Sequence, residues 1–136
     1  MKRTQIRELA FQLLYSLEIQ KEIEEEQIQL FLEENEIEEE EQSKYIRETL
    51  AGVQNKKEAI ELLIANNLKE NWTMQRIAKI DLAILKLAIY EMVFVKLPYK
   101  VVINEAVELA KKYGDDNAKS FVNGILASVV KEEKLA

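Results

Sequence analysis

The segment from residue 74 to residue 95 constrains the fold of this chain most, because it is apolar on most faces that a helix would present. Its apolar residues are Ile77, Ile80, Leu82, Ile84, Leu85, Leu87, Ile89, Met92 and Val93. A helix of this kind has to be surrounded by other helices, so the segment predicts the centre of a helical fold. Its longest apolar stretch is interrupted by Asp81, Lys86 and Glu91, which favours a buried helix over a membrane span.

Amphipathic periodicity predicts six further helices around the central one. Apolar residues recur at three- and four-residue steps within residues 6–17, 28–32, 45–53, 60–68, 102–113 and 118–129. The chain has only three glycines and one proline, and Pro98 separates the central helix from the next. With 136 residues, 48% of them hydrophobic, the sequence predicts one all-α domain of about seven helices.

Four small residues predict local backbone features. Gly52 lies inside the third helical pattern, where glycine costs about 1 kcal/mol relative to alanine, so we expect a neighbouring helix to pack closely against it. Gly114 follows the sixth pattern and is typical of the left-handed residue just after a helix. Thr4 and Thr73 precede helical patterns and are predicted to cap them.

Charge is distributed unevenly along the chain. The formal net charge is −6, yet residues 18–48 hold thirteen of the twenty-five acids and only three of the nineteen bases. The rest of the chain therefore carries sixteen bases against twelve acids. Because a polyanion responds to the local field, the negative mean charge does not exclude an RNA partner.

The chain lacks the side chains on which most enzymes and metal sites depend. It has neither histidine nor cysteine, which removes the commonest general bases, metal ligands and thiol nucleophiles. Its glycines are isolated and form no phosphate-binding loop. The acidic run at residues 36–41 has no neighbouring apolar pocket that would tune a carboxylate for catalysis. We therefore predict no catalytic residue, no metal site and no cofactor.

A basic cluster occupies the N-terminus, where Lys2, Arg3 and Arg7 join the terminal amine off the apolar stripe of the first helix. This cluster is either an ordinary basic terminus or a phosphate-binding helix end. Since RNA sequence is read mainly on unstacked bases, the second interpretation needs a nearby aromatic side chain. Phe121, close to Lys119, is a candidate, although its position in an apolar stripe equally fits a core residue.

Two adjacent motifs make the sequence resemble the NusB family. Residues 97–114 read Leu-Pro-Tyr-Lys-Val-Val-Ile-Asn-Glu-Ala-Val-Glu-Leu-Ala-Lys-Lys-Tyr-Gly, and residues 119–126 read Lys-Ser-Phe-Val-Asn-Gly-Ile-Leu. Residues 7–10, 12–15 and 87–91 match the family in the same order. The acidic segment at residues 22–41 shows no such resemblance.

The resemblance implies an all-α fold of two perpendicular helical bundles, at about residues 1–70 and 71–136 of a single domain. It also implies a non-enzymatic, cytoplasmic transcription antitermination factor of bacteria. NusB-type proteins bind single-stranded boxA RNA of ribosomal RNA transcripts together with NusE, a ribosomal small-subunit protein. With other Nus factors, they help the RNA polymerase elongation complex to read through terminators.

The resemblance further assigns residues to these partners. RNA binding is expected from Lys2, Arg3, Thr4, Arg7, Lys119 and Phe121. NusE binding is expected from Gln75, Arg76 and Asp81. The N-terminus holds fewer basic residues here than in relatives. Each phosphate contact that is lost lowers the slope of log K against log salt by about one. Asp81 lies within an apolar run, so it needs either a neighbouring cation or a protein interface.

Three other functions compete with this one. Some RNA methyltransferases carry a NusB-like domain, but we expect no cofactor-binding domain in this chain. A helical module that binds only protein would tolerate charge reversal at Arg3 and Arg7. A small-molecule enzyme is disfavoured by the missing chemistry. The sequence leaves open whether the chain is a monomer or a homodimer, and whether the segment 22–41 has a role beyond solubility.

Overall fold

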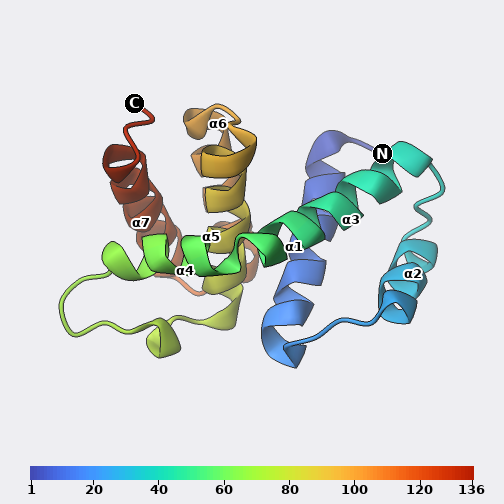
Figure 1. Ribbon diagram of the computed structural model, residues 1–136, viewed down its shortest axis with the longest axis horizontal. Coiled ribbons are helices and arrows are strands. Elements are labelled where there is room, and N and C mark those ends of the chain that lie inside the picture. The colour runs from blue at the N-terminus through green and yellow to red at the C-terminus, as the bar shows by residue number, and fades with distance from the viewer.

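The computed structural model describes residues 1–136 and contains seven α-helices and no strand (Figure 1). The elements are α1 (Arg3–Gln20), α2 (Glu25–Glu34), α3 (Glu40–Asn55), α4 (Lys57–Asn66), η1 (Met74–Arg76), α5 (Lys79–Ile89), η2 (Tyr90–Val95), α6 (Tyr99–Tyr113) and α7 (Ala118–Glu132). The predictions of an all-α fold and of about seven helices are confirmed.

Helix α5 forms the centre of the molecule. Its residues from Asp81 to Ile89 are all buried, and it contacts α1, α3, α4, α6 and α7. In Figure 1, α1, α2 and α3 lie on one side of α5 and α7 lies on the other. The central position predicted for the most apolar segment is therefore confirmed. None of the helices combines the length and the apolar character that a membrane crossing requires.

The central helix begins later than the predicted segment 74–95, ends at Val95 as predicted, and changes its winding before that end. It begins only at Lys79, after Ile77 and Ala78, whose backbones are extended with ψ angles of 130° and 141°. Residues 74–76 form a separate 3₁₀ turn, η1. At the other end, the helix continues as the π-helix η2 and stops at Lys96, whose φ is 66°. The apolar pattern identified the buried part of the helix but not its backbone breaks.

Helix α4 joins the two halves of the chain. In Figure 1, α3 and α4 run across the direction of α1 and α5. Helix α4 contacts α5 and α7 in addition to α3. The division of the chain at about residue 70 stays a prediction.

Two glycines allow close approaches within the fold, whereas the two threonines do not cap helices as predicted. A Cβ atom at Gly52 would lie 2.2 Å from the hydroxyl oxygen of Tyr90, so the predicted close packing at Gly52 is confirmed. Gly114 has a φ of −91°, so the prediction of a left-handed residue was wrong. Glycine is needed there because a Cβ atom would lie 2.4 Å from Cβ of Ala118. Thr4 lies inside α1, and Thr73 makes no side-chain capping hydrogen bond, so neither predicted threonine cap forms.

Replacing Gly52 by alanine is expected to lower the free energy of unfolding by about 1–3 kcal/mol, because the added methyl group overlaps the Tyr90 ring. Urea denaturation of the wild type and the variant measures this change. The double variant Gly52→Ala/Tyr90→Leu serves as the control, because it removes the ring. A Gly52→Ala protein as stable as the wild type would contradict this prediction, because the Tyr90 ring would then move aside at a cost no larger than the roughly 1 kcal/mol that alanine gains in a helix.

Candidate nucleic-acid interface

The basic residues at the start of α1 reach solvent, with the exception of Arg7. Lys2, Arg3 and Thr4 are all exposed, and no ion pair in the structure includes Lys2 or Arg3. The backbone N–H of Lys2, the N-cap of α1, donates a hydrogen bond to Oε1 of Gln5 at 2.9 Å. These side chains therefore surround the positive end of the helix dipole, where an anion is favoured.

Arg7 is buried and does not face solvent as its place off the apolar stripe had predicted. Its side chain is 5% exposed, and its Nε donates to Oε2 of Glu91 at 2.7 Å. A second guanidinium nitrogen, Nη1, pairs with Glu105 of α6. The two carboxylates hold Arg7 in the junction of α1, η2 and α6, where its guanidinium is paired with Glu91 and Glu105 and forms part of the wall of a hollow beside α6.

Two hollows beside α6 connect the start of α1 with α7. Thr4 and Asn104 line a hollow of about 500 Å³, and Asn104 and Asn123 line a neighbouring one of about 360 Å³. Lys119 is exposed one helical turn before Asn123, and so shares its face of α7. The acids of the first hollow are paired with bases: Glu8 with Lys112, Glu105 with Arg7, and Glu108 with Lys111. A surface of polar and apolar side chains therefore runs from Thr4 past Asn104 and Asn123 to Lys119.

Phe121 lies on the opposite face of α7 from Lys119, because two residues correspond to about 200° around a helix. It is half-buried, and its ring centroid lies 6.3 Å from that of Trp72 at an interplanar angle of 47°. The two rings line a groove of about 530 Å³, together with Asn67, Lys69, Ser120, Gly124, Ile125 and Ser128. We call this the aromatic groove. Phe121 thus combines a contact with the core and a place in the aromatic groove.

Trp72 is a residue of the aromatic groove that the sequence did not single out, because it lies in the chain break that precedes Thr73. It is 44% exposed, and the guanidinium carbon of Arg76 lies 5.4 Å from its ring centroid. A tryptophan in a loop, four residues from an arginine, was the available signal. Side chains that bind ligands are often presented by loops of this kind.

Gly124 keeps the aromatic groove open on the side of α7. A Cβ atom at this position would meet nothing within 4 Å, so close packing does not explain this glycine. Glycine in the middle of a helix costs about 1 kcal/mol relative to alanine. The absence of a side chain at Gly124 therefore leaves room in the aromatic groove beside Phe121.

The three residues expected to bind a protein partner lie in different environments. Gln75 is exposed and lines a groove near Lys79, whereas Arg76 is exposed above Trp72. Asp81 is 9% exposed, and no ion pair includes it. Burial, and then the charge of Asp115, raise the pKa of Asp81 above its ordinary value. The sequence suggested two explanations for Asp81, a neighbouring cation or a protein interface. The structure shows no cation paired with Asp81.

Comparison with known proteins agrees with this architecture. The model of the NusB family matches residues 4–131. A transcription antitermination protein NusB from Acetivibrio thermocellus is 47% identical over 132 residues, which cover 96% of this chain and 90% of that protein.

Solved structures extend the likeness to the fold. NusB of T. maritima aligns with a TM-score of 0.85 and 34% identity, covering 98% of this chain and 93% of that one. A crystal structure of the antitermination factors NusB and NusE in complex with double-stranded RNA aligns with a TM-score of 0.84 and 27% identity, covering 97% and 99% of the two chains. The resemblance seen in the sequence motifs is confirmed, and the chain belongs to the NusB family.

Proposed function

We propose that this chain is an antitermination factor that binds single-stranded boxA RNA of ribosomal RNA transcripts together with NusE. In the bacterial cytoplasm it assists the RNA polymerase elongation complex, with other Nus factors, in reading through terminators. The observation that carries RNA binding is the exposed ring of Trp72 beside Phe121, over a groove that Gly124 leaves open. Relatives named for antitermination, and one solved with NusE and double-stranded RNA, support the proposal.

The aromatic groove suits an unstacked nucleobase. Trp72 and Phe121 offer flat apolar surfaces, while Ser120 and Ser128 offer hydroxyl groups for the edge of a base. Stacking on an aromatic side chain contributes about 1–3 kcal/mol per base and depends little on its identity. A base in duplex RNA is not free to enter such a groove, so the groove favours a single strand.

Phosphate contacts are assigned only to exposed side chains. Lys2, Arg3 and Thr4 at the start of α1, and Lys119 on α7, flank the surface that passes Asn104. Arg7 is removed from this set because its side chain is buried between Glu91 and Glu105. Its role in the proposal is to hold the start of α1 in place.

Reversing the charges of Lys2 and Arg3 to glutamate is expected to weaken RNA binding by about tenfold or more at low salt. The slope of log K against log salt is expected to fall by about two, because each basic side chain that neutralises a phosphate contributes about one unit. Fluorescence anisotropy of a labelled boxA-like RNA, with and without NusE and at several salt concentrations, measures both quantities.

The matched control for this experiment is Lys131→Glu/Lys134→Glu, which reverses two exposed charges, one in the last turn of α7 and one just after that helix. Tight, salt-sensitive binding that depends on NusE and fails only in the N-terminal variant supports the adaptor. Equal binding by both variants would remove the N-terminal cluster from the interface. No RNA binding in any mixture would favour a module that binds only protein.

The NusE-binding face is assigned to Gln75, Arg76 and Asp81. The carboxylates of Asp81 and Asp115 lie close enough for the charge of one to act on the other. Neither carboxylate is paired with a lysine or arginine in the structure. A lysine or arginine of a basic ribosomal protein would neutralise them, and complementary charge across an interface contributes specificity and association rate.

Asp81→Asn is expected to stabilise the free protein at neutral pH and to weaken NusE binding. The folded protein raises the pKa of Asp81, so the charged carboxylate disfavours folding at high pH, and this cost disappears below its ordinary pKa of about 4. The stability gain of the variant should therefore shrink as the pH falls. Urea denaturation at neutral and acidic pH, with the exposed Asp116→Asn as the control, measures it. A variant that binds NusE as tightly as the wild type would place Asp81 outside the interface.

A further inference from the structure

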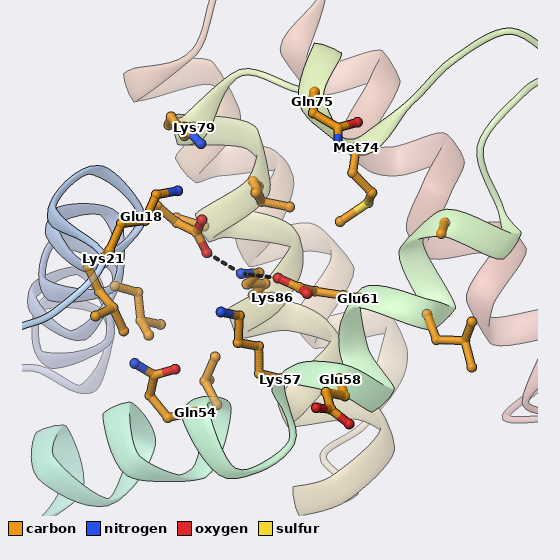
Figure 2. A pocket seen from close by; sticks show the side chains of 17 residues that line it. Glu18, Lys21, Gln54, Lys57, Glu58, Glu61, Met74, Gln75, Lys79 and Lys86 are labelled. Atoms are coloured by element: carbon orange, nitrogen blue, oxygen red, sulfur yellow. Dashed lines mark hydrogen bonds and ion pairs between the residues drawn. The ribbon is translucent and has the colours of Figure 1, made fainter.

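A larger groove lies between α1, α4 and α5, on a part of the surface unrelated to the aromatic groove. It has a volume of about 620 Å³, and no residue lines both grooves. Its apolar wall includes Leu17, Met74 and Leu82, and the amides of Gln54 and Gln75 face the same space (Figure 2). We call it the lysine groove. A volume of this size is within the range of sites that hold small molecules, which is about 300–1,000 Å³.

Four lysines line the lysine groove, and only Lys86 forms an ion pair, although the charge of Glu18 also acts on Lys21. Lys86 pairs with Glu18 and with Glu61, the latter at 3.0 Å. Lys21, Lys57 and Lys79 also line the groove, and no ion pair of the structure includes them. The groove is lined by four lysines and three glutamates, so it carries a net charge of +1 in a chain whose net charge is −6.

Two of these amines face each other across the mouth of the groove. Lys21 follows α1, Lys79 begins α5, and Figure 2 shows their side-chain nitrogens converging. The close amine and charge of Lys79 lower the pKa of Lys21. Because like charges brought together repel, an anion placed between them would relieve the repulsion.

The carboxylates of the groove do not supply that anion. Glu18 and Glu61 are already bound to Lys86, and in Figure 2 the carboxylate of Glu58 points away from the three amines. A phosphate monoester carries a charge of about −1.5 to −2 at neutral pH, which suits several lysines better than the single charge of a carboxylate does. Lysine amines bind phosphate as point charges and need no fixed geometry.

We propose that the lysine groove binds a nucleotide, with the phosphate between Lys21 and Lys79. The base lies against the wall formed by Leu17, Met74 and Leu82. The amides of Gln54 and Gln75 are available to the polar edge of the base. The nucleotide is either a free nucleoside monophosphate or the 5′-phosphorylated end of an RNA strand. This site is separate from the RNA surface proposed above, but it shares Gln75 with the proposed NusE-binding face.

The test is a titration of the full-length, ¹⁵N-labelled protein, followed by two-dimensional NMR. AMP and GMP are expected to shift the amide signals of the residues that line the lysine groove. Adenosine lacks the phosphate, so it should bind at least about tenfold more weakly than AMP, because one charged contact contributes about 1.5–3 kcal/mol. Inorganic phosphate lacks the base, so it should also bind more weakly than AMP. A short RNA with a 5′-phosphate, compared with the same RNA with a 5′-hydroxyl, distinguishes the two sources of the nucleotide.

The variant Lys21→Gln/Lys79→Gln is expected to weaken AMP binding by about tenfold or more, since it removes two charged contacts. Its matched control, Lys131→Gln/Lys134→Gln, removes two exposed charges elsewhere and should bind AMP as the wild type does. Both pairs lie on the surface, and a thermal melt verifies that each variant folds. The proposal is overturned if neither nucleotide shifts signals of the groove, or if the control loses as much affinity as the groove variant.

Discussion

Replacing Arg7 by methionine is expected to lower the free energy of unfolding by about 3–5 kcal/mol, the largest loss of stability that we expect from one substitution in this chain. The change leaves the carboxylate of Glu91, which is 3% exposed, without its bidentate partner. Glu105 loses the same partner, but its side chain is 26% exposed and water replaces part of the interaction. The cost therefore arises mainly from an unpaired buried charge at Glu91.

Urea denaturation separates this effect from the removal of an ordinary surface ion pair. Arg47 is a suitable control because it pairs with Glu25, whose side chain is 70% exposed, and exposed pairs contribute about 0–1 kcal/mol. The double variant Arg7→Met/Glu91→Leu should recover much of the stability, because it removes both buried charges. If Arg7→Met costs no more than Arg47→Met, Arg7 does not hold α1 against η2.

Replacing Trp72 by alanine is expected to weaken binding of boxA-like RNA by about 1–3 kcal/mol, or roughly five- to 150-fold in Kd. The ring supplies one of the two aromatic surfaces of the groove, and Arg76 lies above it. Because the ring is 44% exposed, its removal should change the free energy of unfolding only slightly. Anisotropy with labelled RNA measures the weaker binding, and the exposed Val101→Ala on α6 is the control.

Gly124→Ala tests the same groove with a variant that is expected to be more stable than the wild type. Alanine favours the helix by about 1 kcal/mol, and the added methyl group meets no neighbour within 4 Å. The variant should therefore unfold at a higher urea concentration and bind RNA more weakly, since the methyl group occupies space beside Phe121. A more stable protein with unchanged RNA affinity would show that the base does not lie against α7.

The sequence predicted the helices better than it predicted the surfaces between them. Periodicity located α1 and α6, because the alternation of apolar and polar residues along a helix is local information. The all-round apolar character of α5 predicted its central position, and the motifs at residues 97–114 and 119–126 identified the family. Gly52 was correctly assigned to a close approach of two helices, although its partner Tyr90 was not identified.

The candidate site depended on contacts between distant parts of the chain. Arg7 and Glu91 are 84 residues apart, so no local pattern shows that an arginine near a basic terminus is buried. The same limit applies to Trp72 and Phe121, which meet only when the η1 segment folds against α7. Asp81 was recognised as unusual, but its proximity to Asp115 is a product of the tertiary fold.

The buried charges of the central helix also determine which way round α1 can lie. Arg7 near the start of α1 pairs with Glu91, and Glu18 near its end pairs with Lys86. If α1 packed on α5 in the reverse direction, Arg7 would meet Lys86 and Glu18 would meet Glu91. Apolar surfaces alone discriminate poorly between the two orientations, whereas like charges in a medium of low dielectric constant repel strongly. We expect these four side chains to select a single topology from the alternatives that the same hydrophobic pattern permits.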